Sequence, residues 1–380
     1  MFKKTNKIIL ATGIFYPDVG GPAIHVRKIA EALHARGLNP VVITYSESGR
    51  SDQFPFEVVR IPRSLPSFVR WPVYCWQVLR NSFGATHLYA FNLTTAGLPV
   101  FIVGKMLRKK ILIRVAGDPI WERVVEGGKR FLSIADYYNR GLHLVDRPQV
   151  FNLIRRTLPR FNSVVFYTPL LKDLYEKHYG VSPQKTSLVF NPVTRREASG
   201  VDLVSEPTVL FAGRFVAYKN LELVIKSFDT ARQKLSRGEL ILIGDGPDKE
   251  KLIELAGSMS SKSHIRIIPK VSQEKLFEYI RNSWFGIGPA LTEFNPNFIL
   301  ECLSFGKPVL LSRGNGLSVQ LPDDFLFYPG SEDELTEKIT RFFTPHFYDG
   351  AVRAVAELEL NQSWADVIQF HLNILGVETI

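Results

Sequence analysis

The sequence has little cysteine and no long apolar segment. Its two cysteines, Cys75 and Cys302, lie far apart among 380 residues and in no C-x-x-C spacing. This excludes a disulfide scaffold and a cysteine-based zinc site, and it indicates a reducing compartment. No stretch approaches the roughly 18 consecutive apolar residues that a membrane-spanning helix needs. We therefore expect a chain that does not cross a membrane and that works in the cytoplasm.

The chain also lacks acidic residues relative to basic ones. Lysine and arginine total 47 and aspartate and glutamate 37, which gives a formal net charge of +10. Such a charge attracts phosphate-rich partners. The basic residues are dispersed, and no nucleic-acid-binding motif is present, so we expect no nucleic-acid partner. A non-catalytic nucleic-acid binder remains the less favoured alternative.

Short apolar runs alternate with longer amphipathic segments, which is typical of βα units that build parallel sheets. The first series of predicted strands covers residues 8–12, 41–44, 57–61, 87–90, 111–115, 164–167 and 187–190. The second series covers residues 208–211, 240–243, 265–268, 285–287, 309–311 and 325–328. The sequence thus predicts an α/β protein with two Rossmann-like, doubly wound domains that face a central cleft.

A polar stretch over residues 194–206 separates the two series and is interpreted as a linker. We expect an N-terminal domain at residues 1–195, a second domain at 196–350, and a C-terminal segment at 351–380 that returns to the first domain. Residues 347–375 have a helical pattern with an apolar stripe.

The first candidate site is the glycine pair Gly20 and Gly21, which precedes a predicted helix over residues 24–35. Glycines at such a turn let backbone N–H groups approach a phosphate at the positive end of the helix dipole. Many βα turns carry glycines for geometry alone, so both interpretations stay open.

Two cations follow the first strand of the second domain. Arg214 offers a planar guanidinium and Lys219 a compact charge, both placed near strand and helix ends where a diphosphate would bind. The alternative is a pair of solvated surface cations, but their position favours a binding role.

Two glutamates, Glu293 and Glu301, enclose seven residues that include a proline suited to a first helical turn. Glu301 is surrounded by apolar neighbours, so its carboxylate needs a partner. Vicinal hydroxyl groups of a ligand are suitable donors to such a carboxylate.

With these motifs the chain resembles the family-4 retaining glycosyltransferases, also described as glycosyl transferases group 1, which have the GT-B architecture. The resemblance rests on residues 15–21 with His25, on residues 213–214 with 219–220, on the turn at residues 244–247, and on residues 293–301 followed by 306–309. It spans nearly the whole chain, and the two-glutamate motif is its most specific part.

The resemblance implies a nucleotide-sugar donor and assigns roles to its contacts. Arg214 and Lys219 would bind the diphosphate, which Gly20 and Gly21 would approach from the first domain. Glu301 would hold the ribose hydroxyls. On the helix that carries Glu301, Asn297 and Phe298 would offer backbone N–H groups.

For the transferred sugar the resemblance implies Glu293 as the contacting residue and Asp118 as an acceptor-side catalytic residue. Asp118 also precedes a proline and is suited to a simple turn. The role of His25 stays open in the same way, and the default interpretation is a histidine on the helix surface. Phe294 stands where the family often has glycine, which leaves the loop geometry and the sugar pocket open. Lys270 and Val271 stand where a glycine turn commonly contacts the base, so the choice between a uridine and a guanosine base stays undecided.

The resemblance implies a hexosyltransferase that retains the anomeric configuration and has no covalent nucleophile. No D-x-D triplet occurs in the sequence, and fixed cations such as Arg214 and Lys219 provide the charge stabilisation that a metal supplies elsewhere. We therefore expect no metal and no cofactor. A nucleotide-sugar epimerase or a phosphorylase on the same fold is the nearest alternative.

The basic excess is confined to the presumed acceptor domain. Residues 1–195 contain 28 basic and 12 acidic residues, a net charge of +16, whereas the remainder carries −6. This predicts an anionic partner, a glycan or lipid-linked acceptor of polysaccharide or glycolipid biosynthesis, with peripheral contact to an anionic membrane. Candidate contacts combine aromatic and basic residues: Phe68, Arg70, Trp71, Tyr74, Trp76, Arg80, Lys105, Arg108, Lys109 and Lys110. A core helix with snorkelling cations is the alternative.

Overall fold

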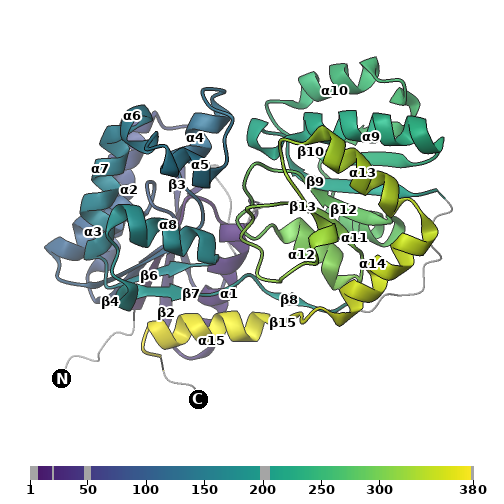
Figure 1. Ribbon diagram of the computed structural model, residues 1–380. Coiled ribbons are helices and arrows are strands. Elements are labelled where there is room, and N and C mark those ends of the chain that lie inside the picture. The colour runs from purple at the N-terminus through teal and green to yellow at the C-terminus, as the bar shows by residue number, and fades with distance from the viewer. Residues whose placement is uncertain (1–6, 19–20, 47–52, 197–205, 378–380) are drawn as a thin grey trace. The chain divides into compact units, whose positions relative to one another are not determined.

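The computed structural model describes residues 7–18, 21–46, 53–196 and 206–377 (Figure 1). The chain divides into two compact units, which are described separately. The first unit comprises Met1–Ile120, Arg147–Phe190 and Trp364–Ile380, and the second comprises Trp121–Asp146 and Asn191–Ser363.

The first unit is built on a seven-stranded parallel sheet in the order β3-β2-β1-β4-β5-β6-β7. The strands are β1 Lys7–Ala11, β2 Asn39–Ser46, β3 Glu57–Pro62, β4 Ala85–Ala90, β5 Lys110–Val115, β6 Ser163–Phe166 and β7 Thr186–Leu188. Each coincides with a predicted strand to within a few residues. Runs of Val, Ile and Leu form these strands because both faces of the sheet are buried.

Helices cover the first sheet: α1 Gly21–Ala35, α2 Ser67–Ser82, α3 Gly97–Met106, α7 Pro148–Thr157, α8 Pro169–Tyr179 and α15 Trp364–Ile374, with short 3₁₀ turns η1 Leu158–Arg160 and η2 Pro183–Lys185. The C-terminal helix α15 packs on α1, and its buried Val367 and Leu372 join the core that also contains Val26 and Ile29. The expected return of the C-terminal helix to the first unit is confirmed.

The second unit has a six-stranded parallel sheet in the order β11-β10-β9-β12-β13-β14. Its strands are β9 Thr208–Arg214, β10 Glu239–Asp245, β11 Ile265–Ile268, β12 Phe285–Gly288, β13 Val309–Ser312 and β14 Leu326–Phe327; β8 Val193–Thr194 and β15 Asn361–Gln362 form a separate antiparallel pair. The two Rossmann-like sheets confirm the predicted fold class.

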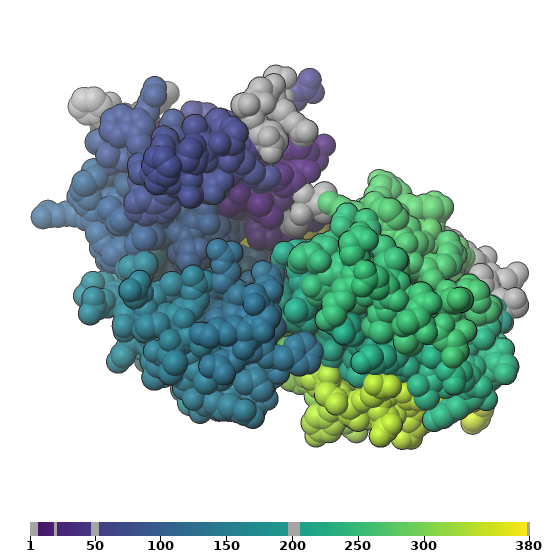
Figure 2. All heavy atoms as spheres, turned by 90° about the horizontal axis from the view of Figure 1, so that it is seen from above, coloured from purple at the N-terminus to yellow at the C-terminus, as the bar shows by residue number. Residues whose placement is uncertain are grey.

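Helices α9 Leu221–Leu235, α10 Lys249–Ser258 and α13 Glu332–Phe342 cover one face of this sheet, and α11 Gln273–Asn282 and α12 Asn297–Ser304 cover the other (Figure 1). The space-filling view from above shows the outer surface of the α9 and α10 layer in green (Figure 2). The unit also contains α4 Trp121–Glu126, α5 Ile134–Asn139, α6 His143–Asp146, α14 Pro345–Glu357, η3 Ala217–Lys219, η4 Lys262–His264 and η5 Asp323–Phe325.

The two units divide the chain differently from the expected limits at residues 195 and 350. Residues 121–146 group with the second unit, and the boundary expected at residue 195 falls after Phe190. The segment 347–375, expected as one helix, is interrupted by β15, which pairs with β8. Tyr348 and Val355 of α14 are buried in the second core, whereas α15 is buried in the first, so the interruption lets one segment serve two cores.

The turn after β10 requires glycine. A Cβ atom on Gly244 would lie 1.9 Å from Gly213 O, and one on Gly246 would lie 2.2 Å from Phe215 O. Only glycine permits so close an approach of two backbones. The glycines of residues 244–247 therefore hold the end of β10 against the end of β9, where Arg214 begins the candidate site.

Candidate active site

Lys219 and Glu293 form an ion pair at the carboxyl edge of the second sheet. Lys219 ends η3 after β9, and Glu293 lies in the loop after β12, the neighbour of β9 in the sheet. Lys219 Nζ lies 2.7 Å from Glu293 Oε1, and the side chains are 17% and 7% exposed. The structure thus brings together two residues 74 positions apart that the sequence analysis assigned to the same site.

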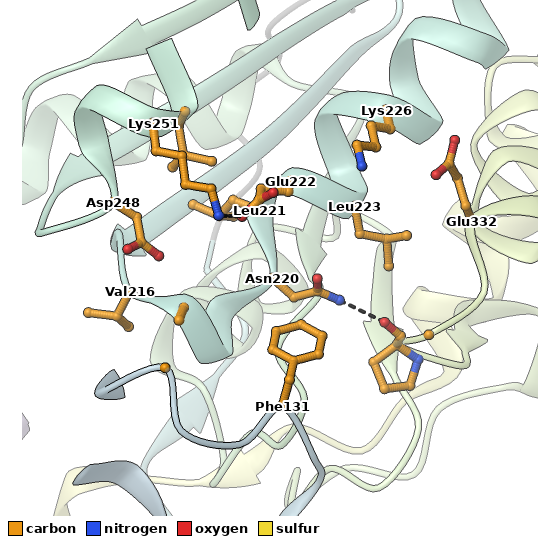
Figure 3. Close-up of a pocket in the computed structure, with 15 residues that line it drawn as sticks. Phe131, Val216, Asn220, Leu221, Glu222, Leu223, Lys226, Asp248, Lys251 and Glu332 are labelled. Carbon is orange, nitrogen blue, oxygen red and sulfur yellow. Dashed lines mark hydrogen bonds and ion pairs between the residues drawn. The ribbon is translucent and has the colours of Figure 1, made fainter. Parts of the chain in front are cut away.

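Backbone contacts fix both partners. Asn220, which follows Lys219, adopts a left-handed conformation with φ +53° and donates from Nδ2 to Pro329 O over 2.7 Å (Figure 3). Leu291 N donates to Tyr218 O, and Gly316 N donates to Glu293 O. A lysine and a carboxylate held in this way form a preorganised polar pair.

Arg214, at the end of β9, lies five residues before Lys219. Its Nη1 is 3.3 Å from Glu126 Oε1, and its side chain is 67% exposed. The guanidinium therefore remains accessible to an anion while it contacts one carboxylate. Glu126, on α4, was not identified from the sequence, because nothing in its local pattern indicates a partner 88 positions away.

The helix that carries Glu301 begins at Asn297, with Pro296 as the preceding cap residue. The first N–H groups of α12, which include those of Asn297 and Phe298, have no acceptor within the helix. Asn191 Nδ2 donates to Asn295 O and to Asn297 Oδ1, at 3.2 Å and 2.9 Å, and so fixes the start of α12. Phe298 is buried in the core.

Glu301 is partly buried, as expected from its apolar neighbours. Gln273 Nε2 donates to Glu301 Oε1 over 3.2 Å. Burial raises the pKa of the Glu301 carboxyl above its ordinary value, while the hydrogen bond from Gln273 and the charge of Arg196 oppose this effect. A carboxylate in this position gains from additional hydrogen-bond donors.

Asn295 in the middle of the two-glutamate motif is a residue that the sequence analysis missed. It has φ +66°, is 2% exposed, and accepts from Ser318 N at 3.1 Å. Asparagine tolerates the left-handed conformation better than most residues, whereas the proline that follows favours extended backbone, so the local sequence does not indicate this conformation. It fixes the loop between Glu293 and α12.

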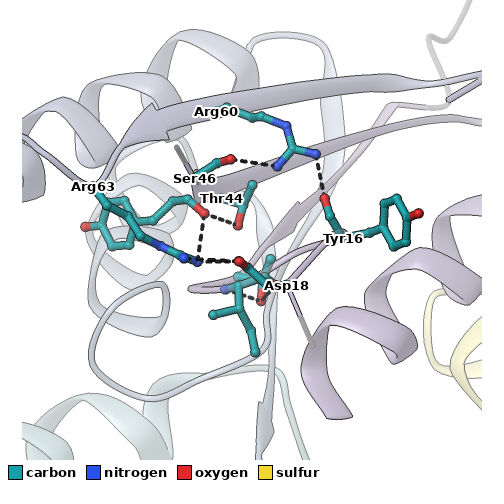
Figure 4. Close-up of polar contacts among 9 residues, drawn as sticks. Tyr16, Asp18, Thr44, Ser46, Arg60 and Arg63 are labelled. Carbon is teal, nitrogen blue, oxygen red and sulfur yellow. Dashed lines mark hydrogen bonds and ion pairs between the residues drawn. The ribbon is translucent and has the colours of Figure 1, made fainter. Parts of the chain in front are cut away.

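Two arginines hold the loop between β1 and α1 in the first unit. Arg63 forms an ion pair with Asp18, and Arg60 Nη2 donates to Tyr16 O over 2.7 Å (Figure 4). Gly21 is the first residue of α1, three residues before the expected helix start. Gly20 lies outside the described residues. Arg60 and Arg63 were not anticipated, because their contacts join β3 to a loop more than 40 positions earlier.

Asp118 lies in the first unit and is completely buried. Its Oδ2 accepts from Tyr175 OH at 2.9 Å, and its Oδ1 accepts from Ile120 N at 3.1 Å. The second bond closes a turn two residues long, which is the usual structural use of aspartate before proline. These contacts favour the turn role that the sequence left open.

His25 does not lie on a helix surface, so that default expectation is wrong. It is 4% exposed, and its ring packs against Trp364 of α15 with the centroids 4.9 Å apart and the ring planes tilted by 58°. Its Nε2 lies 3.5 Å from Arg114 Nη2. The C-terminal helix covers this face of α1, which local periodicity does not reveal.

Some candidate membrane residues of the first unit are exposed, whereas others are buried or hydrogen-bonded within the protein. Phe68 and Trp76 of α2 are 79% and 59% exposed. Tyr74 is buried and donates to Thr12 O and Ile43 O, so its surface assignment is wrong. Lys105, Arg108 and Lys110 are exposed, whereas Arg70 donates to Arg63 O. None of the helices in the described ranges has the length and apolarity to span a bilayer.

In the part of the chain that the structure describes, no three His, Cys, Asp or Glu side chains gather as metal ligands. The polar groups at the edge of the second sheet are instead Lys219, Arg214, Glu293, Glu301 and the α12 N-terminus. Two cations, two carboxylates and free helix N–H groups are suited to a diphosphate and the hydroxyl groups attached to it.

The two Rossmann-like sheets are those of the GT-B fold, and sequence comparison identifies a family of sugar-transferring enzymes. The family Glycosyltransferase Family 4 matches residues 19–197, and Glycosyl transferases group 1 matches residues 197–346. The chain belongs to this glycosyltransferase family.

Individual relatives are distant. Protein CapJ of Staphylococcus aureus is 32% identical over 133 residues, which are 35% of this chain and 34% of CapJ. Alpha-monoglucosyldiacylglycerol synthase of Streptococcus pneumoniae is 21% identical over 86% of this chain and 76% of its own length. The structure of sucrose-phosphate synthase from Thermosynechococcus elongatus has a TM-score of 0.73 at 18% identity and covers 98% of this chain and 100% of that one. The first of these matches covers about a third of the relative's length.

Proposed function

We propose that the protein transfers a hexose, with retention of configuration and without a metal, from a UDP- or GDP-sugar to a glycan or lipid-linked acceptor. The observation that carries this proposal is the Lys219–Glu293 pair, 2.7 Å apart, with Glu293 in the loop that leads into α12. Lys219 and Arg214 bind the diphosphate, Glu301 accepts from the ribose hydroxyls, and Glu293 orients the sugar.

In the proposed reaction the bond between the anomeric carbon and the diphosphate oxygen breaks while a bond to the acceptor oxygen forms on the same face. The acceptor proton passes to the departing diphosphate oxygen. Negative charge grows on the diphosphate, and Lys219, Arg214 and the first N–H groups of α12 stabilise it. No protein side chain forms a covalent intermediate, and no step needs a metal.

A sugar-nucleotide panel tests the proposal. UDP-glucose, UDP-galactose, UDP-N-acetylglucosamine and GDP-mannose are incubated with the protein in excess EDTA, and released UDP or GDP is measured with the anomeric configuration of the product. We expect one donor to be consumed, with retention. Lys219→Ala should lose at least a hundredfold in kcat/KM, whereas Lys234→Ala, an exposed lysine at the end of α9, should retain activity. Epimerised nucleotide sugar or phosphorolysis would contradict the proposal.

For the acceptor we propose a lipid-linked or glycan substrate at the cytoplasmic face of a membrane. Residues 1–195 carry a net charge of +16, and α2 and α3 pack side by side with exposed Phe68, Trp76 and Met106. Exposed apolar side chains on a basic unit are suited to an anionic lipid surface. The streptococcal relative is named for a glucosyl diacylglycerol, which is a lipid.

Vesicle co-sedimentation tests the membrane part separately. We expect binding to phosphatidylglycerol vesicles at low salt, weaker binding at moderate salt, and little binding to phosphatidylcholine vesicles. The double variant Phe68→Ser, Trp76→Ser should lose binding, and Ile253→Ser, an exposed residue on α10 of the second unit, should not. Equal binding by all three proteins would contradict the membrane assignment.

A further inference from the structure

The second unit contains a cavity of about 450 Å³ whose lining includes none of Arg214, Lys219, Glu293 and Glu301. The first turns of α9 and α10, the loop before α13, and the loop after α4 enclose it (Figure 3). Val216 and Ala217 line it, and Ala217 begins η3, the turn that ends with Lys219. The cavity is therefore a neighbour of the candidate donor site but does not include its charged residues.

The polar lining of this cavity carries both signs of charge. Glu222, Asp248 and Glu332 supply carboxylates, and Lys226 and Lys251 supply ammonium groups. Lys251 Nζ lies 2.5 Å from Glu222 Oε1. A lining with more carboxylates than lysines repels a phosphate, because like charges in a partly enclosed site disfavour binding. It remains well suited to a neutral ligand that both donates and accepts hydrogen bonds.

Lys226 and Glu332 both line the cavity, and both residues are exposed (Figure 3). Within the described part of the chain, neither side chain takes part in an ion pair or a side-chain hydrogen bond. One supplies three donors and the other only acceptors. The cavity lining thus contains one hydrogen-bond donor group and one acceptor group that ligand hydroxyl groups could engage.

Phe131 adds an aromatic face to the cavity. Its side chain is 57% exposed, and in Figure 3 its ring points toward Asn220. The loop that carries it turns at Gly128, which has φ +69°. The negative face of an aromatic ring attracts the C–H groups of a pyranose ring. The side-chain amide of Asn220 already donates to Pro329 O. The phenyl ring of Phe131 supplies an apolar part of the lining.

We propose that this cavity binds one residue of a neutral oligosaccharide, with the pyranose ring against Phe131 and its hydroxyls between Lys226 and Glu332. This proposal rests on the proposed glycosyltransferase function, since the ligand would be the saccharide part of the acceptor. The site would hold a sugar residue away from the reacting one and so favour longer acceptors over short ones.

Saccharide binding without nucleotide provides the test. Maltotetraose, cellotetraose, tetra-N-acetylchitotetraose and mannotetraose serve as probes in saturation-transfer NMR, followed by titration of any binder. We expect at least one to bind, with affinity at least tenfold weaker in Phe131→Ala and in the double variant Lys226→Ala, Glu332→Ala. Phe83→Ala, which removes another exposed phenyl ring, should bind as the wild type does.

Three results would overturn the assignment: no saccharide binding by the wild type, binding unaffected by the cavity variants, or binding of inorganic phosphate that Lys226→Ala abolishes. UDP and GDP titrations of the same proteins keep the two proposals distinct. Saccharide binding without nucleotide binding contradicts the proposed function, whereas nucleotide binding without saccharide binding contradicts the cavity assignment. Unfolding temperatures of all variants exclude misfolding as the cause of a loss.

Discussion

The ammonium group of Lys219 lies 2.7 Å from the carboxylate of Glu293, although the family resemblance assigns these residues to different parts of the donor. Both side chains are largely buried, so each is the main counter-charge of the other. A diphosphate that binds Lys219 therefore shares it with Glu293. This competition makes the consequences of the two substitutions unequal.

Removal of Glu293 should impair turnover more than nucleotide binding. In Glu293→Ala the lysine loses its protein partner and is free for the diphosphate, so we expect UDP or GDP affinity to stay within about threefold of wild type or to rise, while kcat falls about a hundredfold. Calorimetric titration and steady-state kinetics measure the two quantities. Parallel losses of affinity and kcat would contradict separate roles.

Removal of Lys219 should cost stability as well as affinity. Lys219→Ala leaves a buried carboxylate without its partner, which lowers the free energy of unfolding by about 3 kcal/mol. The double variant Lys219→Ala, Glu293→Gln removes that charge and should recover most of the loss. Denaturant unfolding of the two variants gives the comparison, and equal stability of single and double variants would argue against the pair.

Glu301 predicts a pH dependence of nucleotide affinity. Burial raises its pKa above the ordinary value, so the carboxylate becomes protonated at a higher pH than an exposed glutamate. Its capacity to accept from both ribose hydroxyls is lost as the pH falls through that raised pKa. We expect UDP or GDP affinity to fall about tenfold across this range, and Glu301→Gln to be weaker at all pH values and nearly pH-independent. A wild-type affinity as flat as that of the variant would exclude Glu301 from the site.

Glu126 should weaken anion binding by Arg214. The pair is 3.3 Å apart and Arg214 is 67% exposed, so the contact contributes no more than about 1 kcal/mol. Glu126→Gln should therefore raise nucleotide affinity by up to about fivefold, with the gain smaller at high salt. Arg214→Ala should reverse the gain when combined with it. A fall in affinity on Glu126→Gln would mean that the carboxylate orients Arg214 rather than competing for it.

The extent to which the sequence predicts this molecule depends on the range of the interactions. Parallel strands buried on both faces are continuous apolar runs, so β1, β5 and β9 are apparent from composition. The break between α14 and α15 is not apparent from the sequence, because it depends on which core each helix enters. The carboxyl-edge positions of Lys219 and Glu293 follow from the motifs, whereas their direct pairing depends on the neighbouring order of β9 and β12.

Residues that hold the site in place were harder to predict than those proposed to bind the substrate. Asn191 and Gln273 fix α12 and Glu301 through side-chain contacts with distant segments. Nothing in the sequence around either residue distinguishes it from a surface amide. His25 shows the same limit, since its burial depends on a helix more than 300 positions later.

Acid should destabilise the first unit through His371 of α15. This side chain is buried against Tyr89, whose OH lies 3.0 Å from His371 Nδ1, and burial beside Arg114 lowers its pKa to about 3. Between pH 6.5 and 3 the unfolded chain binds a proton that the folded chain does not. The free energy of unfolding should fall by up to about 1.4 kcal/mol per pH unit in this range from this group alone. His371→Gln should flatten the profile measured by denaturant unfolding, and an unchanged slope would contradict this account.

Asp118 should act as a positioning residue. Both carboxylate oxygens are engaged, with Tyr175 OH and with Ile120 N, and the side chain is completely buried. Asp118→Ala leaves these donors unpaired and should lower the free energy of unfolding by about 3 kcal/mol, whereas Tyr175→Phe should cost about 1 kcal/mol because it removes one hydrogen bond.

A kinetic comparison separates a positioning role from a catalytic one. If Asp118 acts through position, both Tyr175→Phe and Asp118→Asn should lower kcat, and neither variant should change the pH profile of kcat. A catalytic aspartate predicts the opposite pattern: Asp118→Asn would lose nearly all turnover at unchanged unfolding temperature, while Tyr175→Phe would remain active.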